Sequence, residues 1–362
     1  MKTSLDIARL RLRNQRLAGD PFERPQDVVG WLGAVQAQDY AGAKWAVAQR
    51  TTGVDNATLD RLFDDGAILR THMMRPTWHF VVPTDIRWIL ELTAPRVHAA
   101  SAYYYRTLGL DAATFARSDA LLAEVLSGGR QLTRTELTPA FEERGIDASG
   151  LRLGFLIMHA ELEGIVCSGA RKGKQHTLAL LDDRAPGTRS LSLDDAPGAL
   201  ARRYFAGHGP AQVRDFCWWS GLTVAQARRG IEVAGSHLAR RAVGGSEYWF
   251  EASLEVRRPV APSVHLLPNF DEYLVAYKDR SAAFDPSTGT EVAASDALGN
   301  VVVSGGQVVG HWRRDVGGGR ITIEASLRAG PHDVEEHALR EACERYGKFL
   351  GMPVMLVVTR AA

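Results

Sequence analysis

The sequence has few cysteines and no long apolar run, and each shortage argues against a class of protein. Its 362 residues include three cysteines, Cys167, Cys217 and Cys343, which lie far apart and are odd in number. This spacing argues against a disulfide framework or a zinc-finger pattern and fits a reducing compartment. No apolar run reaches membrane-spanning length, and the first residues lack the apolar core of a secretory signal. We therefore expect a cytoplasmic protein without a membrane span.

The chain also has almost no net charge. Lysine and arginine number 43 against 42 acidic residues, which leaves a formal charge of +1. Such a balance gives no general attraction to nucleic acid or membrane, so any such attraction must come from local patches. The apolar content of 45% is ordinary for globular proteins. Because single cores stop growing at roughly 250–300 residues, we expect several domains.

A loose pattern of helices and two strand-like runs recurs three times. The first copy has a helix at 25–36, a strand-like run at 44–51, a helix at 57–69 and an extended run at 75–83. The second has helices at 133–145 and 151–164 and strands at 165–169 and 176–181. The third has helices at 210–222 and 223–235 and a hairpin at 238–252. Helix, helix and hairpin together are typical of the winged variant of helix-turn-helix.

Two of these helices carry start signals, because Thr133 with Glu136 and Thr223 with Gln226 have the spacing of capping boxes. After Pro259 the pattern becomes β-rich, with one helix near 333–350. We predict an α+β protein with three tandem winged-helix units followed by a β-rich, barrel-like C-terminal domain. The expected ranges are 1–115, 116–190 and 191–258 for the units and 259–362 for the last domain.

Several motifs that suggest cofactors fail on inspection. "GARKGK" lacks the spacing of a phosphate-binding loop, and "GGGR" between two strands is most simply a turn. "HDVEEH" is out of register for a zinc-protease motif, because His332 and His337 would not share a helix face. We expect neither a metal nor a nucleotide cofactor.

Basic residues gather in three places that a duplex could approach. The first helix is rich in arginine against the single acid Asp6, the tip at 170–175 is basic, and the third unit has two arginine pairs. The candidates for phosphate contacts are Arg9, Arg11, Arg13, Arg16, Arg171, Lys172, Lys174, Arg228, Arg229, Arg240 and Arg241. The alternative is that these are ordinary solvated charges. The turn-rich tips at 170–175 and 304–307 are expected to be exposed and able to reach a lesion.

Two neutral amides, Gln36 and Gln38, follow the apolar helix of the first unit. On a continuous helix they would point roughly 200° apart, but where the backbone becomes extended they can face the same way. Taken alone, the pair could equally be a cap or a solvated surface feature.

Three stretches together, "GAVQAQDYAGAKWAV", "LRTHMMRPTWHFV" and "LLPNFDEYLVAYKDR", resemble the AlkZ-type family of DNA glycosylases. The resemblance covers essentially the whole chain. It implies tandem winged helices, a terminal β-barrel and a catalytic Gln-x-Gln motif, which here is Gln36-Ala37-Gln38. The related YcaQ-like branch has Gln-x-Asp instead. The family removes N7-alkylated guanines, and AlkZ-type members unhook interstrand crosslinks.

The resemblance makes Gln36 and Gln38 the expected catalytic residues and leaves the roles of neighbouring side chains open, including Asp39, Arg75 and His79. An N7-alkylated guanine is cationic and leaves as a neutral base, so paired amides that stabilise the sugar cation and position water suffice. The only nearby lysine, Lys44, is expected to be solvated or to contact phosphate. We expect a monomeric, monofunctional glycosylase acting on double-stranded DNA and leaving abasic sites, and the alternative is a non-enzymatic winged-helix regulator.

Overall fold

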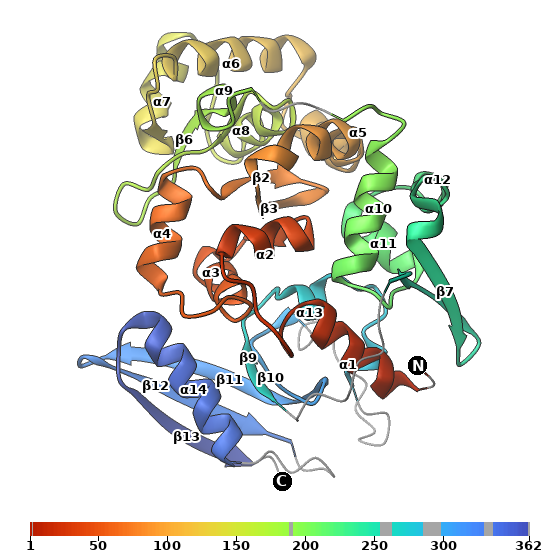
Figure 1. Ribbon diagram of the computed structural model, residues 1–362. Helices are drawn as coiled ribbons and strands as arrows, with labels where there is room; N and C mark the ends of the chain where they lie inside the picture. Colours follow the sequence, from red (N-terminus) through yellow and green to blue (C-terminus); the bar gives the residue numbers. More distant parts are fainter. Residues whose placement is uncertain (2, 188–190, 254–262, 285–297, 329–335, 361–362) are drawn as a thin grey trace.

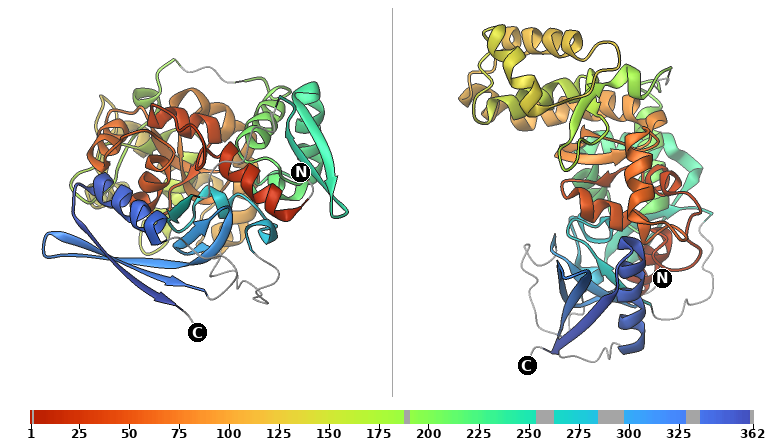
Figure 2. Two further views of the ribbon diagram at one scale, coloured as in Figure 1. Left: turned by 60° about the horizontal axis from the view of Figure 1, so that its bottom comes forward. Right: turned by 90° about the vertical axis from the view of Figure 1, so that its left-hand side faces the viewer.

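A computed structural model describes residues 1, 3–187, 191–253, 263–284, 298–328 and 336–360. The ribbon is elongated, with helices α6 to α9 at one end and the C-terminal sheet at the other (Figures 1 and 2). The N-terminal residues fill the middle, and the helices α10 to α12 lie beside them (Figure 1). The described chain is a mixture of helices and sheets with a β-rich C-terminal part.

The middle of the molecule is built by residues 25–107. A three-stranded sheet in the order β1-β3-β2 is flanked by four helices. The elements are α2 (Pro25–Leu32), β1 (Val35–Gln36), α3 (Tyr40–Ala48), α4 (Asn56–Asp64), β2 (Leu69–Met73), β3 (Arg75–Val81) and the long α5 (Pro83–Thr107). Proline at the first position of α5 is pre-set for a helix start and supplies no unused N–H group.

The second stretch repeats this order of helix, strand, two helices and two strands. Its elements are α6 (Ala112–Val125), β4 (Leu132–Thr133), α7 (Arg134–Glu143), α8 (Arg152–Leu162), β5 (Val166–Ser168), β6 (Thr177–Leu180) and the short α9 (Leu181–Arg184). The strands pair in the order β4-β6-β5. The predicted capping box is confirmed, because the Thr133 hydroxyl accepts from the N–H of Glu136 and the Glu136 carboxylate accepts from the N–H of Thr133.

The third stretch contains α10 (Ala196–Gly207), α11 (Val213–Ser220), α12 (Val224–Ala234), the turn η1 (Gly235–His237) and the hairpin β7 (Leu238–Val243) with β8 (Ser246–Glu251). Ala211 bridges Trp249 where the other stretches have their first strand. The second predicted capping box, between Thr223 and Gln226, is also confirmed. The same order of elements therefore occurs three times, and its reading as three winged-helix units stays an interpretation.

The C-terminal part is a five-stranded sheet in the order β13-β12-β11-β10-β9. Its elements are β9 (Val264–Leu267), α13 (Glu272–Val275), η2 (Ser281–Ala283), β10 (Val301–Ser304), β11 (Gln307–Gly317), β12 (Arg320–Leu327), α14 (Glu336–Leu350) and β13 (Val354–Arg360). In the described residues this sheet is open, with β9 and β13 at its edges. The hairpin of β11 and β12 turns at Gly318 and Gly319, as expected of "GGGR", and both have positive φ.

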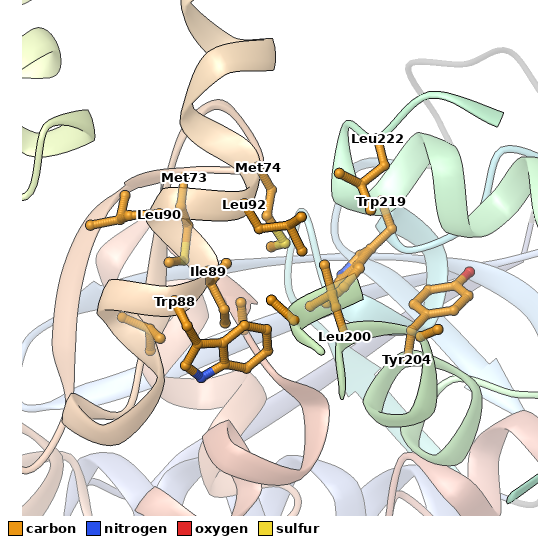
Figure 3. Close-up of a cluster of buried hydrophobic side chains, with 14 of the residues drawn as sticks. Met73, Met74, Trp88, Ile89, Leu90, Leu92, Leu200, Tyr204, Trp219 and Leu222 are labelled. Atoms are coloured by element: carbon orange, nitrogen blue, oxygen red, sulfur yellow. The ribbon is translucent and has the colours of Figure 1, made fainter. Parts of the chain in front are cut away.

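A continuous apolar core joins the first and third stretches. Met74, Ile89 and Leu92 face Leu200 and Trp219 across the junction (Figure 3). Trp219 is fully buried, and full burial of a large apolar side chain contributes roughly 1.5–3 kcal/mol or more. Helix α1 (Ser4–Asn14) ties this junction to the C-terminal part, because Tyr273 donates its hydroxyl to the backbone oxygens of both Ala8 and Gly306.

Some local expectations are wrong. The run at 44–51 is not a strand, since Tyr40–Ala48 form α3. Its alanine-rich sequence favours a helix, and Asp39 caps it by accepting from the N–H of Gly42. The tip at 304–307 is not exposed, because Gly306 and Gln307 are buried and Gly306 lies against Ala8 of α1.

The expected domain boundaries stay predictions. The one after residue 115 falls within α6, and those after 190 and 258 lie outside the described residues, as does His332 of the rejected metal motif.

Candidate functional site

The two glutamines lie on either side of a strand end. Helix α2 ends at Leu32, and Gly33 turns the chain with a φ of 81°. Val35 and Gln36 then pair with β3, where Gln36 lies opposite His79. The N–H of Ala37 donates to the carbonyl of Trp78 at 2.7 Å. The backbone is therefore extended at Gln36 and bends at Gln38, so the two side chains are not held on opposite sides as they would be on a helix.

Gln36 is held on two sides. Its side-chain Oε1 accepts a hydrogen bond from Nη2 of Arg75 at 2.9 Å. Its backbone N–H donates to Oε1 of Glu272 at 2.9 Å. Because arginine only donates, the first bond also fixes which end of the amide is the oxygen. Gln36 is thus held by both its side chain and its backbone, and it is 7% exposed.

Glu272, at the start of α13, has a buried carboxylate that accepts all of its side-chain hydrogen bonds from N–H donors. Its Oε2 accepts from Nε1 of Trp219 at 2.9 Å and from Nε2 of His208 at 3.3 Å. Burial alone raises the pKa of this carboxyl, but the hydrogen bond from His208 and the positive charge of Arg75 bring its pKa below the ordinary value. Glu272 is therefore an anion at neutral pH.

His79 completes this group as a neutral ring. Burial lowers its pKa to about 3, and the nearby charge of Arg75 acts in the same direction. Its Nδ1 lies 3.0 Å from the backbone oxygen of Thr77, so Nδ1 carries the proton, and Nε2 accepts from Arg75 at 3.4 Å. His79 is hydrogen-bonded and buried, as a structural role requires. It has no proton to give to a leaving group.

Gln38 differs from Gln36 in being exposed. Among the described residues its side chain has no hydrogen-bond partner, so both its oxygen and its NH₂ group are available. Asp39 caps α3 immediately afterwards. A Cβ on Gly42 would lie 2.8 Å from the Asp39 carboxylate and 3.1 Å from Asn269. The glycine therefore lets the loop before α13 approach the start of α3.

Lys44 does not lie in solvent as expected. It is 4% exposed, and its Nζ lies 2.7 Å from Oδ1 of Asp60 on α4. Burial lowers the pKa of Lys44, while the bond to Asp60 opposes that change. The same oxygen accepts from the hydroxyl of Tyr40 and from Arg171. This lysine is therefore committed to the interior and is not presented to DNA.

A cavity of about 390 Å³ opens on the other side of the same strands, between the first and second stretches. Arg70 lies over the ring of Trp78 at 4.4 Å and donates from Nε to the carbonyl of Ala37 at 3.1 Å. Glu161 of α8 accepts from Nε1 of Trp78 and from His72. Trp78 is half-buried at this cavity, not in the core as a packed strand would have it.

The basic residues expected to contact phosphate differ in whether their side chains are exposed and free of an ion pair. Arg11 is buried, donates to the carbonyl of Pro210 and lies 3.6 Å over the ring of Tyr277, so it cannot reach a phosphate. Ion pairs engage Arg171 with Asp60, Lys172 with Glu136 and Arg240 with Glu247. The exposed residues without an ion pair in the described structure are Arg9, Lys174, Arg228 and Arg241. Arg13 is partly exposed, Arg16 packs on Phe22 and Trp31, and Arg229 pairs with Glu232.

Glu272 is not predicted from the sequence, and the role of Arg75 stays open there. Glu272 lies in the stretch "LLPNFDEYLVAYKDR", whose acidic residues carry no spacing signal for a site. The two adjacent acids Asp271 and Glu272, between the apolar residues before and after them, are the one local sign of buried and partnered carboxylates.

The chain is similar in sequence and in fold to known DNA glycosylases. The sequence model of the AlkZ-like DNA glycosylase family matches residues 29–349, and the chain belongs to this family. It is 28% identical over 319 residues to an interstrand DNA cross-link repair glycosylase of Streptomyces sahachiroi, covering 83% of this chain and 85% of that protein.

The structural likeness extends further along the chain. The solved structure of Streptomyces sahachiroi DNA glycosylase AlkZ superposes with a TM-score of 0.81 at 24% identity, covering 99% of this chain and 100% of that one. None of the described helices is long and apolar enough to cross a bilayer.

Proposed function

We propose that this glycosylase is monofunctional, acts as a monomer on double-stranded DNA, and hydrolyses the N-glycosidic bond of N7-alkylated purines. We include purines joined in interstrand crosslinks among its substrates. The observation that carries this proposal is the pairing of a fixed Gln36 with an exposed Gln38, beside an ionised Glu272 and a neutral His79. The crosslink-repair relative supports the inclusion of crosslinks.

The first step follows from the leaving group. An N7-alkylated purine carries a positive charge, so breaking its bond to the sugar moves the electron pair to the base and releases it neutral. No acid is needed for this departure. Next to Gln36, Glu272 is ionised and His79 is neutral, with its Nδ1–H donating to the backbone oxygen of Thr77.

The second step concerns the sugar and the water. The sugar becomes an oxocarbenium-like cation, which amide oxygens stabilise by their dipoles. Gln36 has its oxygen engaged by Arg75, so the free oxygen of Gln38 is the better acceptor for a water that attacks the sugar carbon. As the new C–O bond forms, the proton of this water passes to solvent, because a glutamine does not titrate. The product is an abasic strand and a free base.

The arrangement of the domains also suggests how the protein binds the duplex. We infer that three winged-helix units and the C-terminal sheet surround the duplex, with Arg9, Lys174, Arg228 and Arg241 among the phosphate contacts. Lys44 does not act as an amine nucleophile, because it is buried and paired with Asp60.

The test is incubation of the protein with a duplex that holds one N7-methylguanine, followed by alkaline cleavage. We expect strand breaks at the modified guanine, no covalent adduct on borohydride treatment, and little release of uracil, which is a poorer leaving group. A footprint on one undamaged sequence without base release would favour a regulator instead. Release from a crosslinked duplex tests the second part of the substrate range separately.

A further inference from the structure

Three side chains that could bind a metal converge away from the glutamines, where α5 packs on α8. His98 comes from α5, His159 from α8, and Glu163 is the residue that ends α8. One nitrogen of each histidine and one Glu163 oxygen lie within 4.8 Å of one another. His159 and Glu163 are four residues apart on a helix, so they lie on one face.

The ring of His98 already has partners that would orient it. Its Nδ1 lies 3.0 Å from the hydroxyl of Tyr105, and its Nε2 lies 3.0 Å from Glu163. Metal-binding histidines commonly direct their second nitrogen to a carboxylate, hydroxyl or carbonyl in this way. Nδ1 of His159 lies 3.2 Å from Oδ2 of Asp119 on α6 but makes no hydrogen bond among the described residues. The ring of His98 thus directs Nε2 toward Glu163, where a metal would bind between them.

The ring of His159 is also fixed by packing. It stacks on Phe115 with centroids 3.9 Å apart and planes 9° apart, and it lies 5.1 Å from the ring of His98. Helices α5, α6 and α8 therefore hold the two imidazoles before any ion binds. Preorganised side chains lose little freedom on binding, which favours affinity.

An ion can enter from solvent. The side chains of His98, His159 and Glu163 are 23%, 16% and 47% exposed. A cavity of about 250 Å³, lined in part by His98 and Glu163, adjoins them. Tetrahedral zinc needs its donor atoms roughly 3.3 Å apart, and side-chain rotation closes the remaining gap. Water can fill the fourth position.

We propose that His98, His159 and Glu163 form a binding site for a first-row divalent metal ion, with zinc as its best occupant. Two imidazole nitrogens and one carboxylate match the ligands that zinc accepts. The negative charges of Glu163 and Asp119 favour a dication. The ion would fasten α5 of the first stretch to α8 of the second, so its role is structural. This proposal departs from the expectation of no metal, which rested on sequence motifs alone.

The test measures zinc directly and does not depend on base excision. Metal-free protein is titrated with zinc chloride by calorimetry, with melting temperatures recorded alongside. We expect one zinc per chain and a rise in melting temperature of roughly 2–5 °C at saturation. Cobalt(II), as a spectroscopic substitute, should show the strong visible bands of a four-coordinate site.

Variants separate this site from ordinary histidine–carboxylate pairs. His98→Ala and Glu163→Gln should each weaken zinc binding by at least about 10-fold, and Glu163→Gln keeps the side-chain volume. His337 and Glu341 form an exposed pair at 3.2 Å that has no third metal-binding side chain among the described residues, so His337→Ala is the matched control and should bind zinc as the wild type does. The proposal is overturned if the wild type takes up no zinc, or if Glu163→Gln and His98→Ala bind it unchanged.

Discussion

The carboxylate of Glu272 accepts the backbone N–H of Gln36 at 2.9 Å, across 236 residues of sequence. The contact joins the C-terminal part to the strand that carries the first glutamine. Together with the hydrogen bond from Arg75 to the Gln36 side chain, this contact holds Gln36 in place. Neither hydrogen bond involves Gln38. Glu272 is therefore a positioning residue in this account.

Removing the charge at Glu272 should slow excision without abolishing DNA binding. In Glu272→Gln the new NH₂ group faces N–H donors of Trp219 or His208, so the acceptor geometry behind Gln36 is disturbed. We expect a single-turnover rate on N7-methylguanine lower by about 10-fold, equivalent to ~1.4 kcal/mol, and a loss of stability of about 1–3 kcal/mol. A purely structural role would leave the rate of the folded fraction unchanged, which binding and rate measured on the same sample would reveal.

Asp271, the residue before Glu272, should affect the stability of the fold and not the excision rate. Asp271 and Arg50 form a bidentate pair at 2.7 and 2.9 Å, and both side chains are 1% exposed. Asp271→Ala leaves a buried guanidinium without its counter-charge and should cost about 3–5 kcal/mol in denaturant unfolding. The double variant Arg50→Met, Asp271→Leu should recover part of that loss. If it is no more stable than Asp271→Ala, the penalty does not come from the unpaired charge.

Basic side chains without an ion pair should contribute more to phosphate binding than basic side chains that are ion-paired. Arg228→Ser and Arg241→Ser should each lower the slope of log affinity against log salt by about 1 if they contact phosphates. Arg171→Met is the matched comparison, because Arg171 is partnered by Asp60, and it should change the slope less. An equal change in all three would mean that the ion pair opens on DNA.

Excision and stability should respond differently to pH. The pKa of Glu272 lies below its ordinary value and that of His79 is about 3, so neither group changes its charge near neutral pH. The excision rate on N7-methylguanine should therefore be flat from about pH 6.5 to 8.5. Stability should fall as pH drops below 6.5, because burial lowers the pKa of His79 and His265 to about 3 and the unfolded chain binds protons there first.

Thermal unfolding at pH 5 and pH 7 checks the second half of this prediction. His79→Gln should lose less stability than the wild type between these values, since it removes one of the groups. A bell-shaped excision profile would indicate a general acid or base that this account lacks.

Sequence patterns within short stretches of the chain predict part of the fold and part of the site. The capping boxes at Thr133 and Thr223 fixed two helix starts, because both partners lie within one turn of chain. The apolar run at 44–51 predicts a strand, whereas Tyr40–Ala48 form a helix, because a short apolar run does not by itself distinguish a buried strand from a buried helix. Glu272 could not be found in this way, because its partner Gln36 is distant in sequence and only folding brings them together.

The most direct test of the central claim is single-turnover excision of N7-methylguanine by Gln36→Ala and Gln38→Ala, with binding to the damaged duplex measured in parallel. The account predicts that each variant excises at least about 10-fold more slowly and binds nearly as the wild type does. Gln38→Glu is the matched control, because it keeps the oxygen acceptor and should lose less than Gln38→Ala. Wild-type rates in both alanine variants, with the fold intact, would contradict the assignment of the paired amides to the reaction.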